Sequence, residues 1–276
     1  MYDLSGKVAL ITGAGGEKGF GRAIANRLAQ EGAFVAVNDV AANPYGAGGW
    51  GGIDSVVEEI EGNGGQAMRV LADVSNADDV DSMVSEVITR FGRLDILVAN
   101  AGSRPGKDRV PLVELTEEAF DEVQRINVKG TFLCCRAAAR HMVGREGGGR
   151  IIIISSTAGK RGVARFSAYV ASKFALVGFT QSLALELGPN GITVNAICPG
   201  FAMTERMTEI AGALRGEDET LEDKLDDMHR ERAESTPLGR TTEPQDIANT
   251  AAFLASDQSE YMTGLAISVA GGNVMT

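Results

Sequence analysis

The sequence predicts an α/β fold, a doubly wound parallel sheet of about seven strands with helices on both faces. Two observations predict it. Seven short apolar runs are rich in β-branched residues and lack polar alternation, as expected of strands covered on both faces. Segments with helical periodicity lie between these runs, and such alternation favours right-handed parallel crossovers. The predicted strands cover residues 7–12, 33–39, 66–73, 94–100, 150–155, 192–198 and 265–271.

The helical candidates fall between these strands, and nothing divides the chain. With 276 residues and 44% hydrophobic side chains, the chain is long enough to bury one large core. It has no Pro/Ser-rich linker, internal repeat or step in composition, so we expect residues 1–276 to form a single domain. The helical candidates lie near residues 19–31, 52–63, 76–91, 116–142, 167–187 and 243–255.

Two segments are longer than short connections require. Residues 41–52 form a glycine-rich stretch after the second strand, and residues 204–236 follow the sixth. A long excursion at the carboxyl end of a parallel sheet often covers a ligand, so we expect 204–236 to cover a substrate. Its acidic run, 217–234, fits a solvated helix face equally well.

Charge and composition exclude several classes of function. The net charge is −11 and no basic cluster is dense enough to follow a phosphate backbone, which argues against a nucleic-acid partner. Three cysteines and two histidines offer no metal-ligand group and no Ser-His-Asp triad. We expect no metal, no signal peptide and no membrane span, and therefore a reducing, cytoplasmic location.

A glycine-rich turn follows the first strand and opens the first helix, in the segment 12–25, TGAGGEKGFGRAIA. Glycines there allow backbone N–H groups to approach a pyrophosphate at a helix N-terminus. About 20 residues further on, Asp39 ends the second strand, where a carboxylate can bind the ribose hydroxyls of NAD and repel the phosphate of NADP. Lys18 could instead accept that phosphate. The sequence therefore predicts a dinucleotide site that favours NAD over NADP.

Tyr169 and Lys173 lie four residues apart in the segment 166–173, FSAYVASK. On a helix they share a face, and a neighbouring ammonium lowers a phenol pKa from about 10, which suits proton transfer. Taken alone, the pair fits an ordinary amphipathic helix as well.

The order and spacing of these motifs resemble those of the classical short-chain dehydrogenase/reductase family, a Rossmann-type fold, over nearly the whole chain. Ser156 lies thirteen residues before Tyr169, and Asn127 stands in RINVKGTF, both as in the family. By this resemblance Tyr169 is the general acid/base, Lys173 lowers its pKa and holds the nicotinamide ribose, and Ser156 binds the substrate oxygen. Asn127 would position a water that links Lys173 to solvent.

The resemblance also implies the cofactor contacts. Asp73 and Val74 would contact adenine, ANAG at 99–102 would line the cofactor cleft, and the Pro-Gly turn would lie beside the nicotinamide. From the residues alone, Asp73 could instead cap the following helix, and Asn100 could satisfy strand-end backbone. The full predicted set is Gly13, Gly19, Phe20, Gly21, Asp39, Asp73, Val74, Asn100, Ala101, Gly102, Tyr169, Lys173, Pro199, Gly200 and Thr204.

Three departures from the family pattern concern the cofactor end. Five residues instead of three separate Gly13 from Gly19, so the turn must bulge by two residues. Ala99 stands where the family has an asparagine, and Ala270 where it commonly has an aspartate. None of these changes touches the proton-transfer residues.

The predicted function is NAD-dependent interconversion of a secondary alcohol and a ketone, in a homotetramer formed through the helices that carry Asn127 and Tyr169. The alternative is a 3-oxoacyl thioester reductase or 3-hydroxyacyl dehydrogenase using NAD(P); from another class, a dinucleotide-sensing protein without turnover. Cations near the cleft favour an anionic substrate, although they fit pairing with the acidic excursion or a neighbouring subunit equally well. The expected substrate contacts are Ser103, Arg104, Lys160, Arg161, Arg165, Phe201, Met203, Arg206 and Met207.

Overall fold

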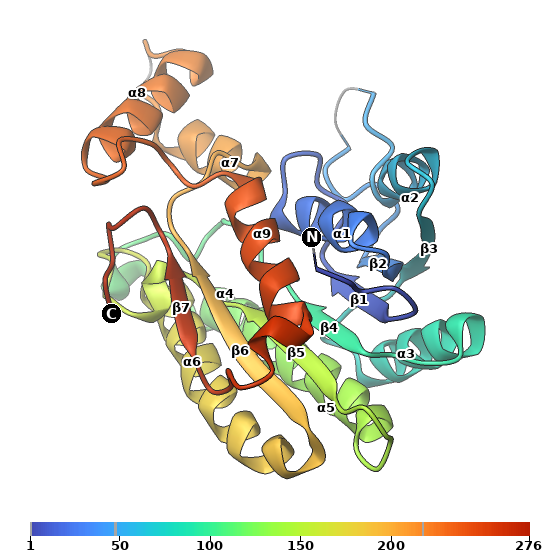
Figure 1. Ribbon diagram of the computed structural model, residues 1–276. Coiled ribbons are helices and arrows are strands. Elements are labelled where there is room, and N and C mark those ends of the chain that lie inside the picture. The colour runs from blue at the N-terminus through green and yellow to red at the C-terminus, as the bar shows by residue number, and fades with distance from the viewer. Residues whose placement is uncertain (1, 47–48, 217) are drawn as a thin grey trace.

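The computed structural model describes residues 2–46, 49–216 and 218–276. Within these residues, seven parallel strands form one sheet in the order β3-β2-β1-β4-β5-β6-β7 (Figure 1). The predicted fold class is confirmed, because each predicted run of apolar residues is a strand. The strands are β1 (Val8–Thr12), β2 (Phe34–Asp39), β3 (Gln66–Leu71), β4 (Ile96–Ala99), β5 (Gly149–Ile154), β6 (Ile192–Pro199) and β7 (Ala266–Val269).

Helices cover both faces of the sheet (Figure 1). One face packs against α1 (Phe20–Gln30), α2 (Ile53–Gly62) and α9 (Pro244–Ala255). The other packs against α3 (Ala77–Phe91), α5 (Thr131–Met142) and α6 (Ser167–Leu187). The segment predicted as one helix near 116–142 is α4 (Glu117–Gln124), a π-helical turn and then α5.

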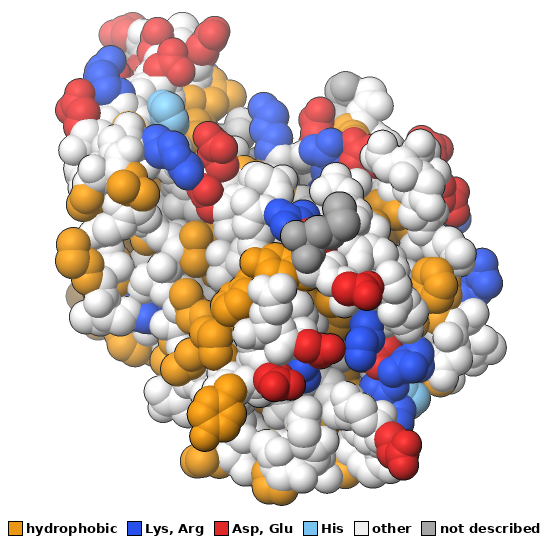
Figure 2. Space-filling view, viewed as in Figure 1, with side chains coloured by type: hydrophobic (Ala, Val, Ile, Leu, Met, Phe, Trp, Pro, Cys, Tyr) orange, Lys and Arg blue, Asp and Glu red, His pale blue; other side chains and the backbone are white. Residues whose placement is uncertain are grey.

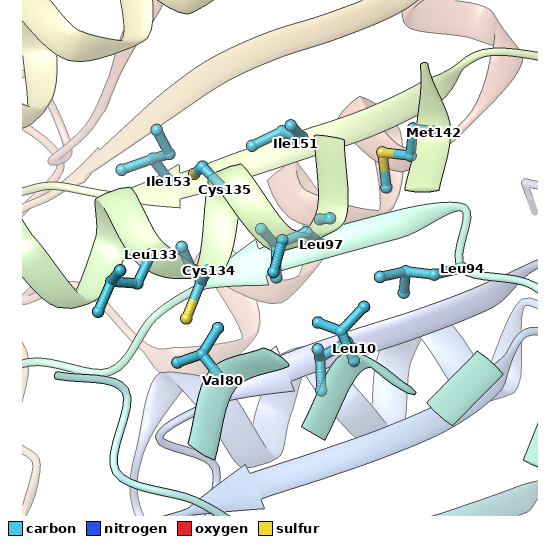
Figure 3. Close-up of a cluster of buried hydrophobic side chains, with 14 of the residues drawn as sticks. Leu10, Val80, Leu94, Leu97, Leu133, Cys134, Cys135, Met142, Ile151 and Ile153 are labelled. Atoms are coloured by element: carbon cyan, nitrogen blue, oxygen red, sulfur yellow. The ribbon is translucent and has the colours of Figure 1, made fainter. Parts of the chain in front are cut away.

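The core beneath α5 shows why the strands lack polar alternation. Side chains from β1, β4 and β5 meet apolar side chains of α5 and α3 in a close-packed layer (Figure 3). Cys134 and Cys135 belong to this layer, and all three cysteines are free and buried. Burial raises the pKa of the Cys134 thiol to about 12, so this cysteine acts as a small apolar side chain rather than as a nucleophile.

The sheet reverses its direction of winding between β1 and β4. From β1 the chain proceeds to β2 and β3 on one side, and it then crosses to β4 on the other. Ligands of open α/β sheets bind in the crevice that opens at the carboxyl ends of such strands. The glycine turn follows β1 and the ANAG segment follows β4, so both predicted cofactor segments lie at this crevice.

The excursion after β6 is mostly helical. It contains α7 (Glu205–Leu214) and the acidic helix α8 (Leu221–Glu234), in which no residue is fully buried. Acidic side chains gather over α8 in the upper left of Figure 2, as expected of a solvated helix face. In the described parts of the chain, we find no helix that combines the length and apolar character needed to cross a bilayer.

Candidate active site

Helix α6 places Tyr169 and Lys173 at the carboxyl end of β5. The side chain of Lys173 is buried, and its Nζ donates a hydrogen bond to the carbonyl oxygen of Ile154, the last residue of β5, at 2.9 Å. The same Nζ lies 5.7 Å from the centre of the Tyr169 ring. Burial lowers the pKa of Lys173 to about 7, and the positive charges of Arg206 and Arg109 act in the same direction.

Ser156 is the second residue after β5 and lines the same cleft. Its Oγ accepts a hydrogen bond from the Ala158 N–H at 3.1 Å, which fixes the side chain at the start of a short 3₁₀ turn. The neighbouring Ser155 donates through Oγ to the Lys173 carbonyl at 2.9 Å. These bonds hold the end of β5 against α6, so Ser156 keeps a fixed place relative to Tyr169.

Asn127 lies behind the cleft, in the π-helical turn Arg125–Gly130. Its Oδ1 accepts from the Ser103 N–H at 2.7 Å, and its Nδ2 donates to Ser172 Oγ at 2.9 Å. Ser172 Oγ in turn donates to the Tyr169 carbonyl at 2.7 Å. Asn127 therefore links the loop after β4 to α6 and positions Tyr169; π-helical turns recur at functional sites for such reasons.

The enlarged glycine turn is held by bonds to neighbouring segments and by one bond within the turn. Gly15 N donates to Asp39 Oδ2 at 2.9 Å, and the Gly15 carbonyl accepts from Trp50 Nε1 at 2.9 Å. Gly19 N donates to the Gly16 carbonyl at 3.3 Å. The bulged turn thus packs against the long segment that follows β2.

The glycines of this turn serve two different purposes. A Cβ on Gly13 would lie 2.7 Å from Ala101 Cα, and one on Gly21 would lie 2.5 Å from the Gly13 carbonyl oxygen, so packing requires both glycines. A Cβ on Gly19 would meet nothing closer than 3.4 Å, yet Gly19 lines the cleft. The first N–H groups of α1 also lack intrahelical acceptors. This cradle fits a pyrophosphate group.

Asp39 ends β2 beside the glycine turn. Besides Gly15 N, its carboxylate accepts from the Val40 N–H at 2.8 Å. Burial raises the pKa of Asp39, although these two N–H groups oppose the shift. Lys18, the competing candidate for a phosphate contact, has an exposed side chain.

The predicted adenine contacts lie outside the cleft cavity. Asp73 Oδ1 accepts from the N–H and the hydroxyl of Ser75, at 2.9 and 2.7 Å, and its Oδ2 pairs with Arg125 at 3.4 Å. Val74 is buried, and a Cβ on Gly130 would lie 2.9 Å from it. The interpretation of Asp73 as a helix cap is wrong, since Asn76 caps α3 by accepting from the Asp78 and Asp79 N–H groups.

Asn100 holds the two halves of the crevice together. Its Nδ2 donates to the carbonyls of Thr12 and Gly13, both at 2.8 Å. Thr12 Oγ1 accepts from the N–H groups of Asn100 and Ala101, at 3.1 and 3.0 Å. The end of β4 is thereby tied to the end of β1 although Ala99 replaces the family's first asparagine.

One cavity of about 110 Å³ collects most of the predicted site residues. Gly21, Asp39, Asp73, Val74, Ala101, Gly102 and Asn127 do not line it; they pack behind or beside it. The predicted residues that line it are Gly13, Gly19, Phe20, Asn100, Ser156, Tyr169, Lys173, Pro199, Gly200 and Thr204.

A second cavity, of about 680 Å³, adjoins the first beneath α7 and α8. The two share Phe20, Ser156, Tyr169, Gly200, Thr204 and Arg206. Of the expected substrate contacts, Arg161, Phe201, Arg206 and Met207 line the larger cavity, whereas Ser103, Arg104, Lys160, Arg165 and Met203 do not. Lys160 instead donates through Nζ to the Ala266 carbonyl at 2.5 Å, and Arg104 pairs with Glu209.

Sequence reasoning missed several residues of the larger cavity. Arg109 and Phe166 reach it from the loops before α4 and α6, and Met228 and Arg232 reach it from α8. Helical periodicity alone could have placed Met228 and Arg232 on one face of the excursion, four residues apart. No motif pointed to Arg109.

The start of α7 lies across the smaller cavity. Glu205 Oε1 accepts from the Lys18 N–H at 2.5 Å, and Arg206 Nη2 donates to the Gly102 carbonyl at 2.6 Å. Arg104 donates to the Pro44 carbonyl at 3.0 Å and lies over the Tyr45 ring. The Glu205 carboxylate thus accepts a hydrogen bond from an N–H group of the glycine turn, where a pyrophosphate would otherwise bind.

Within residues 2–46, 49–216 and 218–276, no three His, Cys, Asp or Glu side chains gather closely enough to bind a metal ion.

Comparison with known sequences gives full-length relatives. A family model described as enoyl-(acyl carrier protein) reductase matches residues 13–273. A short-chain dehydrogenase/reductase of Armillaria gallica is 42% identical over 272 residues, which cover 98% of this chain and 96% of that protein. The 3-oxoacyl-(acyl-carrier-protein) reductase of Staphylococcus aureus is 40% identical over 269 residues, 98% of each chain. Versicolorin reductase of Emericella nidulans is also 40% identical, over 271 residues, 98% of this chain and 97% of that one.

Solved structures agree with this relationship. A short-chain type dehydrogenase/reductase from Mycobacterium marinum superposes with a TM-score of 0.82 at 33% identity, covering 99% of this chain and 97% of that one. A dehydrogenase/reductase from Sinorhizobium meliloti superposes with a TM-score of 0.81 at 38% identity, with the same coverage.

Replacing Glu205 by alanine should strengthen cofactor binding. The change frees the Lys18 N–H and removes a negative charge from the pyrophosphate cradle, so the Kd for NADH should fall by about tenfold, equivalent to about 1.4 kcal/mol. Fluorescence titration would measure it. Glu17→Ala removes an equal charge from an exposed position on the same turn and should change the Kd little. An unchanged or larger Kd in Glu205→Ala would show that Glu205 does not compete with the cofactor.

The pKa of Lys173 predicts a pH dependence of stability. Between pH 7 and the ordinary lysine value of 10.5, the unfolded chain binds more protons at this site than the folded chain. The free energy of unfolding should therefore rise with pH above 7, by up to about 1.4 kcal/mol per pH unit from this group, and Lys173→Met should lack that rise. Urea denaturation at pH 6 to 9 measures it, with exposed Lys129→Met as control. Parallel profiles for wild type and Lys173→Met would contradict it.

Proposed function

Since the chain belongs to the short-chain dehydrogenase/reductase family and is an oxidoreductase that acts on CH–OH or keto groups with NAD(P), we propose that it interconverts a secondary alcohol and a ketone, mainly toward oxidation. One observation carries this proposal. Ser156 and Tyr169 line both the cavity beside the glycine turn and the larger cavity. A substrate in the larger cavity can therefore present its oxygen to both hydroxyls at the place where a cofactor in the cleft would meet it.

The residues act on that oxygen in distinct ways. Tyr169 removes the proton of the carbinol during oxidation and returns it during reduction, and Ser156 donates a hydrogen bond to the same oxygen. Lys173 Nζ lies 5.7 Å from the centre of the Tyr169 ring, and the protons that it does not donate to Ile154 are free to hold a ribose. When bound, the nicotinamide accepts or supplies the hydride. Asn127 keeps Tyr169 in place through Ser172.

We propose NAD as the cofactor because Asp39 stands at the end of β2 with a carboxylate that would repel the additional phosphate of NADP. Arg104 and Arg206 lie near enough to affect the pKa of Asp39, but Arg104 pairs with Glu209. The other cleft residues would meet the pyrophosphate and the nicotinamide ribose, which NAD and NADP share. The proposed preference for NAD therefore depends on Asp39.

The second candidate function is reduction of a 3-oxoacyl thioester. The name of the Staphylococcus aureus relative supports it, as does a cavity that is large and partly apolar. Oxidation of simple secondary alcohols with NAD supports the first candidate; activity confined to acetoacetyl-thioesters would support the second. The alternative of a dinucleotide sensor without turnover is wrong, because the family to which the chain belongs consists of oxidoreductases.

We propose a homotetramer in the cytoplasm. Phe132 on α5 and Phe174 and Leu185 on α6 are 41%, 45% and 83% exposed, and they form apolar surface on the two helices expected at the interface. Exposed apolar side chains that gather on one surface often mark a protein–protein interface. This surface supports assembly through α5 and α6.

Tyr169→Phe should lower kcat by about 10³-fold, because only the transferable proton is removed. The Kd for NADH should stay within about threefold of wild type, which shows that the fold persists. NADH absorbance with a panel of secondary alcohols measures turnover. Near-normal turnover would refute the role of Tyr169.

Asp39→Ala should shift the ratio of kcat/KM for NADP over NAD upward by at least about tenfold, since repulsion of the phosphate is removed. Initial rates with both cofactors measure the ratio. Lys18→Ala is the control and should leave the preference for NAD in place. A wild-type enzyme that prefers NADP would contradict the assignment of Asp39.

Leu185→Glu should reduce the oligomer to smaller species, because a charge would be buried at the interface without a partner. Size-exclusion chromatography with light scattering reads the mass directly. Leu238→Glu places the same charge on an exposed leucine outside α5 and α6 and should leave the mass unchanged. A wild-type monomer would overturn the proposed assembly.

A further inference from the structure

The larger cavity is positively charged although the chain is strongly acidic. Within the part of the chain that the structure describes, its lining includes Arg109, Arg161, Arg206 and Arg232 but no aspartate or glutamate. The whole chain has a net charge of −11, so this local excess of cations runs against the overall charge. Such a cavity attracts anions and disfavours cationic ligands.

Three of these arginines have contacts that account for their positions. Arg161 Nη2 donates to Asn273 Oδ1 at 2.6 Å, and Arg206 donates to the Gly102 carbonyl. The guanidinium of Arg232 lies 5.5 Å from the centre of the Phe201 ring, so it stacks on an aromatic face at the cavity wall.

Arg109 differs because its mostly covered side chain lies beside the predicted acid/base. Its side chain is only 14% exposed. The guanidinium carbon lies 4.3 Å from the centre of the Tyr169 ring and 4.2 Å from that of Phe166. A group bound to this guanidinium would therefore be separated from the oxygen that reacts at Tyr169 by only a short chain of atoms.

The donors of Arg109 are not satisfied by the protein. Its Nη1 lies 3.2 Å from Asp108 Oδ2, yet Nη1, Nε and that carboxylate oxygen are all buried without a hydrogen-bond partner among the described residues. Asp108 offsets part of the charge but makes no hydrogen bond to Nη1 or Nε, and both nitrogens are covered by protein atoms, so they reach a ligand only if the side chain turns. Burial lowers the pKa of Arg109 despite Asp108, as expected of a cation that is incompletely compensated. Unpaired buried donors call for an explanation, and a turn of the Arg109 side chain toward a ligand in the larger cavity would pair them.

We propose that Arg109 binds a carboxylate group of the substrate, so that the enzyme acts on short hydroxy acids and the corresponding oxo acids. A carboxylate matches the planar fork of a guanidinium with two parallel hydrogen bonds. The position of Arg109 over Tyr169 places this carboxylate a few carbon atoms from the reacting carbon. The phosphate of a carrier-bound thioester would lie far from that carbon, and a thioester has no carboxylate there. This inference rests on the proposed alcohol–ketone chemistry and narrows its substrate.

The test compares each acid with its own neutral ester. Initial rates with pyruvate, acetoacetate and 4-oxopentanoate, and with their methyl esters, give kcat/KM for matched pairs. Wild type should prefer at least one acid over its ester by about tenfold or more. Arg109→Gln should lower kcat/KM for that acid by about 100-fold while the ester changes by less than about threefold. Arg109→Lys, which keeps the charge but not the fork, should fall between the two.

Arg165→Gln is the matched control. Arg165 is an exposed arginine near the start of α6 that lines neither cavity, so its loss removes the same charge without removing a donor from the site. It should keep the preference for the acid. Equal losses for acid and ester in Arg109→Gln, or a wild type without any preference for acids, would overturn the inference.

A binding measurement separates this inference from the proposed function. Calorimetric titration with butyrate, and with butyramide as its neutral match, needs no turnover. Wild type should bind butyrate at least about tenfold more tightly than butyramide, and Arg109→Gln should lose that difference. If the enzyme turns over esters and alcohols but binds butyrate no more tightly than butyramide, only the role of Arg109 is refuted. If it turns over none of the substrates but still binds butyrate more tightly than butyramide, only the alcohol–ketone chemistry is refuted.

Discussion

The hydrogen bond of the buried Lys173 amino group is the interaction on which the arrangement of the site depends. A buried polar group requires partners, and here the first is the carbonyl of Ile154 at the end of β5. That bond fixes α6 against the sheet and with it the direction in which Tyr169 points. Ser155 and Ser172 support the same helix from two sides, one by bonding the Lys173 carbonyl and the other by bonding the Tyr169 carbonyl. The position of the phenol thus follows from how the lysine is buried.

The sheet explains why these groups meet the cofactor segments. All seven described strands run parallel, so their carboxyl ends lie at one edge, and the change of winding between β1 and β4 opens a crevice there. Asn100 ties the two strand ends together across that crevice, and the tight contact of Gly13 with Ala101 leaves no room for a side chain. The predicted proton-transfer residues and the glycine turn consequently lie at the same edge of the sheet.

The sequence predicted the strands well because residues buried on both faces leave a continuous apolar signal. The spacing of Ser156, Tyr169 and Lys173 likewise predicted which side chains would share the cleft. Other features carry no local signal. The bond from Trp50 to Gly15 joins two glycine-rich segments whose meeting depends on the whole sheet, and Lys160 is drawn to the Ala266 carbonyl by a strand more than a hundred residues away. Arg109 stands in an irregular loop, so its place beside Tyr169 follows from tertiary packing alone.

Helix α7 touches both cavities, and this has a thermodynamic consequence. Glu205 faces the glycine turn, Met207 and Ile210 face the larger cavity, and Arg206 lines both. A molecule that displaces this helix from the turn also reshapes the chamber on its other side. Linkage then requires the two ligands to influence each other's affinity by the same factor, whichever arrives first. Occupancy of one cavity and affinity at the other are thereby coupled through the residues of one helix.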